Sequence, residues 1–381
     1  MAVLQGFALR AGEVGGDGVK LLLMMNNRII QADIEELVLT SPILKEFQKG
    51  TILVTGATGL LGNQVIRTLL EHNKRNQATV TVVALVRNKE KAEKLFSDVL
   101  NMSHFKLHVA DIQTPIEITE TIDYIIHGAS VTDSSSFVTY PVDTIKTAID
   151  GTKNLLDLAV EKKVKGFLYL SSLEVYGFPD PHRGMVSEED YGYLDPLSVR
   201  SSYSEGKRMV ECLCVAYLEQ YGVPIKIARL TQTFGSGVSY SDNRVFAQFA
   251  RSILEGKNIV LKTTGETVRS YCYTSDAVHA LFYILLKGDH GQAYNVANKM
   301  TAISIRDMAE LVITNFSQGK SKLVFDIAEN PEKLGYNPVM KIELDTNKLE
   351  RLGWKPKVGM EDMYNRLIKS MRIDRKKIEE K

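Results

Sequence analysis

The chain has 381 residues, 44% of them hydrophobic and 24% charged, which is an ordinary globular composition and a length that suits two domains. Its 47 basic and 46 acidic residues leave a net charge of +1, which excludes binding of nucleic acid or a membrane surface through bulk charge. Three cysteines exclude a disulfide scaffold and suit a cytoplasmic location, and Cys212 and Cys214 are spaced poorly for a metal, so no metal is expected.

Residues 1–24 are interpreted as a flexible leader. The apolar run at 21–25 is too short for a secretory signal and follows an acidic, glycine-rich stretch, and no apolar run reaches the ~18 residues of a membrane span. Residues 33–48 carry an apolar stripe broken at Ser41-Pro42, which predicts short helices with Asp33 as the N-cap. We therefore expect residues 1–48 to form an N-terminal extension that is partly flexible.

From residue 51 onward, short apolar runs alternate with amphipathic stretches. Strands are predicted at residues 51–55, 79–86, 105–109, 121–127 and 166–170, and helices at 60–71, 89–100 and 144–162. This alternation predicts an α/β fold with a parallel sheet covered by helices on both faces.

Beyond residue 235 the alternation weakens. A helix is predicted at residues 245–255, a strand at 259–262, a helix at 275–287 and a strand at 293–297. The charged segment 372–381 is interpreted as a solvated helix end or a frayed tail. A smaller mixed α/β unit is therefore expected to follow the first sheet.

The first predicted strand leads into the sequence TGATGLLG, residues 55–62, which is a G-x-x-G-x-x-G turn before a helix. Glycines let the chain turn sharply and let backbone amides approach a pyrophosphate at the helix N-terminus. The alternative is a purely structural glycine turn, but the position after the first strand favours a Rossmann dinucleotide-binding fold. The residues expected to bind the cofactor here are Gly56, Thr58, Gly59, Leu60, Leu61 and Gly62.

The end of the second strand bears on the choice of cofactor. It lacks the acidic residue that binds the ribose hydroxyls of NAD, and Arg87 is placed to pair with a 2′-phosphate, so NADP is slightly favoured over NAD. An exposed arginine without a ligand is the alternative. Further cofactor contacts are expected after the third strand, from Asp111 and Ile112, and after the fourth, from His127, Gly128 and Ala129.

Tyr203 and Lys207 are four residues apart on a predicted helix, so both side chains lie on one face. A lysine ammonium beside a phenol lowers the pKa of the phenol, which can then take a proton from an alcohol while hydride leaves for nicotinamide. Ser172, at the end of the fifth strand, can hydrogen-bond the same substrate oxygen. We interpret the three as a proton-transfer site that also contacts the cofactor; the alternative is a surface tyrosine and a solvated lysine.

Five motifs in order, TGATGLLG, HGAS, SSLEVYG, YSEGK and RSYCYTSDAV with AYNVAN, resemble an extended short-chain dehydrogenase/reductase of the NAD-dependent epimerase/dehydratase family. The resemblance runs from about residue 50 to about residue 370. It implies that a nucleotide-diphosphate sugar is oxidised at C4 by bound NAD(P) to a 4-keto sugar. Epimerisation, dehydration or decarboxylation would follow, with the cofactor regenerated in place.

The residues after Ser172 bear on which of these reactions follows. Family dehydratases resemble Thr-Asp-Glu where this chain has Ser172-Leu173-Glu174, and Leu173 cannot donate a proton. Glu174 remains a candidate catalytic base, with a structural carboxylate as the alternative. The segment RSSYSEGKR, residues 200–208, resembles RSCYDEGKR of UDP-glucuronate decarboxylases. The resemblance therefore favours a decarboxylase or a 4-epimerase.

The same resemblance implies the contacts with substrate. Arg269 stands where the family binds the pyrophosphate, and Gln232 stands where an asparagine contacts the phosphate. Ser236 replaces the proline of the family pattern. Ser130 and Arg244, the latter in the loop 239–244, are expected to contact the substrate. In this family the two helices at 144–162 and 203–221 form the dimer interface, so a homodimer is expected.

The motifs divide the chain into three parts: an extension at 1–48, a dinucleotide-binding domain at 49–235 completed by parts of 270–298, and a mainly substrate-binding domain at 236–381. Two other functions remain open. One is an NADPH-dependent carbonyl reductase of the same superfamily, suggested by Arg87. The other is a non-catalytic NAD(P)-binding scaffold, which would not need Ser172, Tyr203 and Lys207.

Overall fold

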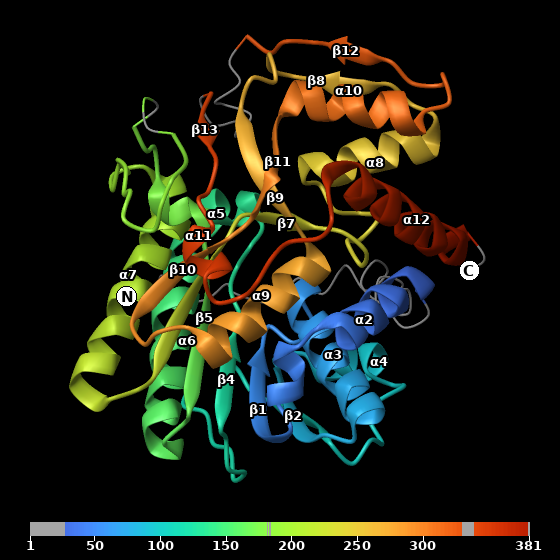
Figure 1. The fold of residues 1–381 in the computed structure, drawn as a ribbon. Helices are drawn as coiled ribbons and strands as arrows, with labels where there is room; N and C mark the ends of the chain where they lie inside the picture. Colours follow the sequence, from blue (N-terminus) through green and yellow to red (C-terminus); the bar gives the residue numbers. More distant parts are fainter. Residues whose placement is uncertain (1–26, 181, 183, 330–338, 380–381) are drawn as a thin grey trace, which may run out of the picture.

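The computed structural model describes residues 27–180, 182, 184–329 and 339–379, so the predicted leader at 1–24 lies outside the described residues. Its largest sheet has seven parallel strands in the order β10-β6-β5-β4-β1-β2-β3 (Figure 1). The strands are β1 (Lys49–Thr55), β2 (Thr79–Val86), β3 (Phe105–Val109), β4 (Tyr124–His127), β5 (Gly166–Ser172), β6 (Ile225–Leu230) and β10 (Gln292–Val296). The strand order reverses between β1 and β4, where doubly wound sheets bind ligands.

Helices cover both faces of this sheet because side chains alternate along its strands. Ile52 and Val54 point to a core with one set of helices, and Leu53 points to a core with the other set. The first set is α2 (Arg28–Thr40), α3 (Leu60–Asn76), α4 (Lys89–Leu95) and α9 (Thr274–Lys287). The second set is α6 (Pro141–Lys162) and α7 (Ser202–Tyr221), which run side by side (Figure 1).

A smaller α/β unit lies beyond the carboxyl ends of the large sheet (Figure 1). Its strands are β7 (Gln232–Phe234), β9 (Val268–Tyr273), β11 (Asn298–Ser304) and β13 (Lys341–Ile342), with β8 (Ile259–Leu261) pairing β12 (Leu323–Phe325). Its helices are α8 (Val245–Glu255), α10 (Ile305–Phe316) and α12 (Met360–Glu379), with α11 (Asn347–Glu350) beside β10. The expected fold class, a Rossmann sheet with a smaller mixed α/β unit, is confirmed.

The N-terminal segment corrects one prediction. Helix α2 begins at Arg28, capped by Asn27, whose side chain accepts a hydrogen bond from the backbone amide of Ile29 at 3.1 Å. Asp33 is therefore not an N-cap but an interior residue of α2, and its side chain is buried. The expected break at Ser41-Pro42 is present, followed by a 3-10 turn at Ile43–Glu46.

The C-terminal end also differs in part from the prediction. Helix α12 continues through the charged segment to Glu379, and Asp374 within it is buried rather than solvated. Within the described ranges, each helix is too short or too polar to cross a lipid bilayer.

Candidate functional site

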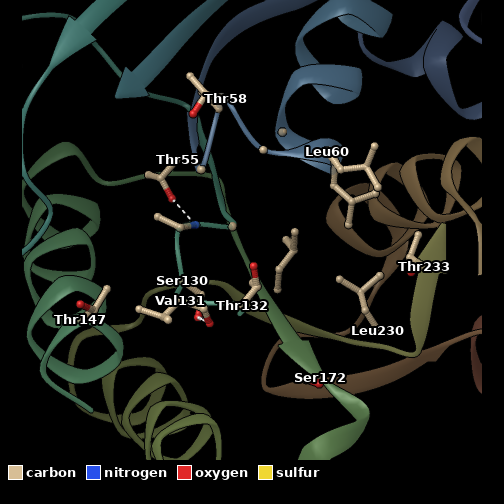
Figure 2. Close-up of a pocket in the computed structure, with 18 of the residues that line it drawn as sticks. Thr55, Thr58, Leu60, Ser130, Val131, Thr132, Thr147, Ser172, Leu230 and Thr233 are labelled. Carbon is tan, nitrogen blue, oxygen red and sulfur yellow. Dashed lines mark hydrogen bonds between the residues drawn. The ribbon is translucent and has the colours of Figure 1, made fainter. Parts of the chain in front are cut away.

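A cavity of about 940 Å³ lies between the carboxyl edge of the large sheet and the smaller unit. Parallel strands end at one edge, so residues that follow β1, β2, β3, β4 and β5 all reach it. Figure 2 shows Thr58 and Leu60 of the glycine-rich loop, Ser130 after β4 and Ser172 at the end of β5 around this space. The cavity is large enough for a dinucleotide-sized ligand and contains polar groups from both units.

Most of the residues predicted for the site line this cavity. From the large sheet and the loops and helices that flank it they are Gly56, Thr58, Gly59, Leu60, Leu61, Gly62, Arg87, Asp111, Ile112, Gly128, Ala129, Ser130, Ser172, Glu174, Tyr203 and Lys207. From the smaller unit they are Gln232, Arg244 and Arg269. His127 is the exception.

Backbone packing explains the glycine-rich loop. Gly56 has φ +65°, and a Cβ there would lie 2.7 Å from the carbonyl of Gly128. A Cβ at Gly62 would lie 2.3 Å from the oxygen of Gly56. Gly59 precedes α3 without a capping side chain, so the first amides of a 17-residue helix are left for an anion. This geometry fits the pyrophosphate of a dinucleotide.

His127 does not line the cavity, which corrects the expectation that it borders the cofactor. Its Nδ1 lies 2.7 Å from Thr55 Oγ1 and its Nε2 lies 2.9 Å from Thr152 Oγ1. Thr152 donates to the carbonyl of Ala148, so it accepts from Nε2–H, and Thr55 donates to Nδ1. Thr55 in turn accepts from the amide of Ala129 at 3.1 Å. His127 thus positions the turn that does line the cavity.

Tyr203 is held from two sides. Its ring stacks on Phe137 of α5 (Ser134–Thr139), with centroids 4.3 Å apart and ring planes at 12°. Its hydroxyl is hydrogen-bonded to Ser172. Lys207 Nζ lies 5.7 Å from the ring centre of Tyr203 and donates to the carbonyl of Leu170 at 2.8 Å. Both residues line the same cavity, and the hydrogen bond to Leu170 fixes the position of the Lys207 ammonium.

The pKa values differ from the prediction that Lys207 lowers that of Tyr203. Burial raises the pKa of Tyr203 to about 12, and its hydrogen bond with Ser172 opposes only part of this effect. Burial lowers the pKa of Lys207 to about 8. Lys207 therefore remains mostly protonated at neutral pH, but Tyr203 needs further positive charge nearby before its phenolate is populated.

Glu174 lies close to Tyr203 and is paired with Arg200, a residue that the sequence analysis did not predict for the site. Its Oε2 accepts a hydrogen bond from Ser204 at 3.3 Å, and its Oε1 lies 3.7 Å from Arg200 Nη2. Arg200 also lies over the ring of Phe137, 5.1 Å from its centroid, and lines the cavity. The position of Arg200, three residues before Tyr203, is the sequence feature that could have indicated its place in the site. The site thus carries a carboxylate and a guanidinium next to the phenol.

The smaller unit presents polar atoms that lack protein partners. Gln232 on β7 and Arg269 on β9 lie on paired strands. Gln232 Oε1 and Arg269 Nε are buried without a hydrogen-bond partner among the described residues. An Arg269 Nη2 atom contacts Met340 Sδ at 3.2 Å, whereas Arg244 at the rim is paired with Asp242 at 2.7 Å. Unpaired buried polar atoms are costly, so the donor Arg269 Nε fits a phosphate oxygen of a ligand, whereas the acceptor Gln232 Oε1 fits a ligand hydroxyl or N–H group.

Comparison with known proteins gives a family and several similar curated proteins. The sequence model described as the NAD dependent epimerase/dehydratase family matches residues 52–297. UDP-glucuronic acid decarboxylase 1 of Xenopus tropicalis is 31% identical over 327 residues, which covers 85% of this chain and 73% of that protein. UDP-glucuronic acid decarboxylase 6 of Arabidopsis thaliana is 32% identical over 314 residues, covering 82% of this chain and 85% of that protein.

Solved structures agree on the fold. The dTDP-glucose 4,6-dehydratase DesIV of Streptomyces venezuelae, solved with NAD bound, has a TM-score of 0.70 at 23% identity and covers 86% of this chain and 98% of its own. UDP-glucuronic acid 4-epimerase of Bacillus cereus, in complex with NAD, has a TM-score of 0.67 at 23% identity, with 84% and 98% covered. At these identities the likeness establishes the fold alone.

Proposed function

This chain belongs to the NAD dependent epimerase/dehydratase family, and we propose that it decarboxylates a nucleotide-diphosphate sugar such as UDP-glucuronic acid through a 4-keto intermediate. The observation that carries the proposal is the convergence of Ser172, Glu174, Tyr203 and Lys207 in one cavity. The relatives named above support the substrate class, and Leu173, which cannot donate a proton, argues against dehydration.

The proposed steps follow from the positions of the side chains. The Tyr203 phenolate takes the proton from the sugar C4 hydroxyl, and Ser172, which is hydrogen-bonded to Tyr203, is placed to hydrogen-bond the same sugar oxygen. A bound nicotinamide would accept the C4 hydride and supply positive charge. The ammonium of Lys207 favours the phenolate. Arg200 offsets the charge of Glu174 and so allows a sugar carboxylate to approach.

Loss of CO2 from the 4-keto acid leaves an enolate, which takes a proton at C5. The C4 carbonyl would then be reduced by return of the hydride from the reduced nicotinamide, with Tyr203 giving the proton back to the C4 oxygen. Glu174 is the proposed group for moving the C5 proton, since Ser204 and Arg200 orient its carboxylate in the cavity. A 4-epimerase would have no use for a base at this position, and we place that reaction second. The proposed substrate contacts of the smaller unit are Gln232 and Arg269 at the diphosphate, with Arg244 at the rim.

For the cofactor, we propose a preference for NADP over NAD within this family. Arg87 at the end of β2 lines the cavity with its side chain exposed, and Lys91 of α4 lines it as well. The end of β2 presents no carboxylate for ribose hydroxyls. An NADPH-consuming carbonyl reductase would share this preference, but it would lose nicotinamide absorbance stoichiometrically, which a closed redox cycle does not.

We also propose a homodimer formed through α6 and α7. The two helices pack side by side and leave several apolar side chains in solvent, among them Val142, Ile145, Met209 and Val215. Such a surface suits a second pair of helices in a four-helix bundle. Sedimentation tests this: a dimer is expected, and a monomer at micromolar concentration would reject the proposal.

The experiment that tests the proposed reaction is a panel of UDP-, dTDP-, GDP- and CDP-sugars, read by mass spectrometry. Loss of CO2 from UDP-glucuronic acid is expected. An isomer of unchanged mass would identify a 4-epimerase, and loss of water would identify a dehydratase. No change in any sugar, with NAD or NADP added, would reject the nucleotide-sugar function altogether.

A further inference from the structure

The N-terminal helix α2 precedes the matched family region, yet it is joined to the cavity wall by buried polar contacts. Asp33, 2% exposed, accepts hydrogen bonds from Tyr273 Oη at 2.5 Å and from Ser236 Oγ. Arg366 of α12 pairs with the other oxygen of Asp33 at 2.7 Å. A buried carboxylate is costly unless it is paired, so these partners fix each other's positions.

A second set of contacts runs beside the first. Asn27, the cap of α2, donates to Ser370 Oγ at 2.8 Å and to Asp374 at 3.2 Å. Ser370 Oγ in turn accepts from the amide of Gly237 at 3.1 Å. Asp374 and Gly237 both line the cavity. We use the name N-terminal clasp for the set Asn27, Asp33, Ser236, Arg366 and Ser370.

The wall that the clasp holds faces the phosphate cradle. Gln64 of α3, two residues after Gly62, donates to the carbonyl of Ser236 at 2.9 Å, and both residues are buried. The segment that follows Ser236, namely Gly237, Val238 and Ser239, lines the same cavity as the glycine-rich loop. The segment at 236–239 is thus fixed against the helix whose N-terminus fits a pyrophosphate.

We propose that the N-terminal clasp retains the dinucleotide, with Asp33 as a positioning residue that acts through Ser236. Without Asp33, the segment at 236–239 loses the buried acceptor that Ser236 and Tyr273 share, and the wall beside the cradle loosens. Slow cofactor release is useful to an enzyme that regenerates its cofactor in place. The clasp itself needs only that a dinucleotide binds at the glycine-rich loop, whatever sugar reaction follows.

The test is the rate of cofactor release, measured by stopped flow. Protein loaded with NADPH or NADH is mixed with excess oxidised cofactor, and the decay of nicotinamide fluorescence is followed without any sugar. The Asp33→Asn variant keeps the side-chain volume but removes the charge. We expect release to be about five- to tenfold faster, which corresponds to one or two lost buried hydrogen bonds. The matched control Glu36→Gln lies on α2 as Asp33 does and removes the charge of an exposed partner of Arg366; it should release the cofactor at the wild-type rate.

Two further variants keep the outcome decisive. Ser236→Ala removes one hydroxyl, should also speed release, and should add little in the double variant with Asp33→Asn because both act through one contact. If Asp33→Asn does not fold, the Ser236→Ala variant alone tests the proposal. A folded Asp33→Asn or Ser236→Ala protein with a lower melting temperature but wild-type release would overturn the proposal. Wild-type protein that binds neither NADPH nor NADH would instead refute the cofactor assignment.

Discussion

Phe137 stacks on Tyr203 with ring centroids 4.3 Å apart and planes 12° from parallel. The stack is supported behind, because Ser202 donates from Oγ to the carbonyl of Phe137 at 2.9 Å. Tyr203 is thereby restricted to one ring orientation, with its hydroxyl toward Ser172. The phenol of Tyr203, the proposed base, thus depends on α5, an element that carries none of the residues predicted for the site.

Phe137→Leu should therefore reduce kcat about tenfold while leaving KM within about twofold, because the stacking energy of ~1 kcal/mol positions the base rather than the substrate. Steady-state kinetics on the sugar that the panel identifies makes the measurement. Phe178→Leu, which changes a partly exposed ring outside the cavity lining, is the control and should be unaffected. A rise in KM alone would assign Phe137 to binding.

Arg200 should determine selectivity for a carboxylated sugar. In Arg200→Met the charge of Glu174 loses its neighbouring cation and repels the substrate carboxylate. Affinity for UDP-glucuronic acid should fall about tenfold, whereas affinity for neutral UDP-glucose should stay unchanged. Calorimetric titration of both sugars measures this difference. Equal losses for the two sugars would contradict the assigned role.

Arg87 should select the cofactor. Arg87→Ala should weaken NADPH binding about tenfold through loss of charge-assisted hydrogen bonds to the 2′-phosphate. NADH has no such phosphate and serves as the internal control. Fluorescence titration gives both dissociation constants. An equal affinity of the wild-type protein for the two cofactors would reject the NADP preference.

His127 should make the protein sensitive to acid. Burial lowers the pKa of His127 to about 3 from an ordinary value of 6.5. The unfolded state therefore binds the extra proton first, so stability present above pH 6.5 is lost as pH falls toward 3. Between pH 7 and pH 5 this group should contribute a loss of about 2 kcal/mol in the free energy of unfolding.

Urea unfolding of wild type and His127→Gln at the two pH values isolates this contribution. The variant is expected to be less stable at pH 7, because the chain from Thr55 to Thr152 is interrupted, but to lose about 2 kcal/mol less on acidification. Identical losses in both proteins would mean that His127 is not buried in its neutral form.

Sequence patterns predicted strands at β1, β2, β3, β4, β5 and β10 of the large sheet, and the β-branched run at residues 79–86 reappears unchanged as β2. They missed β6, whose apolar run is interrupted by Lys226 and Arg229. Nearly all of the residues predicted for the site line the cavity, since the residues that follow parallel strands share one edge. His127 was placed wrongly because it is the last residue of β4, so its side chain points into the core rather than out of the edge.

Other features depend on contacts between distant segments. The partners of Asp33 are Ser236, Tyr273 and Arg366, so its N-cap-like position was misleading. The pKa of Tyr203 was misjudged because the sequence shows the lysine one turn away but not the burial that outweighs it. Phe137 and Arg200 were missed because stacking geometry is set by the packing of α5 against the turn before α7.

We propose that Tyr203 initiates oxidation and decarboxylation of a nucleotide sugar. The most direct test incubates UDP-glucuronic acid with the cofactor-loaded protein and follows the mass of the sugar nucleotide and the release of CO2. We predict a product lighter by one CO2 and no net change in nicotinamide absorbance. We also predict a rate 10²–10⁴-fold lower in Tyr203→Phe, with Tyr193→Phe, an exposed control, unaffected. Undiminished turnover by Tyr203→Phe would exclude Tyr203 as the base, and an unaltered sugar mass with the wild-type protein would exclude decarboxylation of UDP-glucuronic acid.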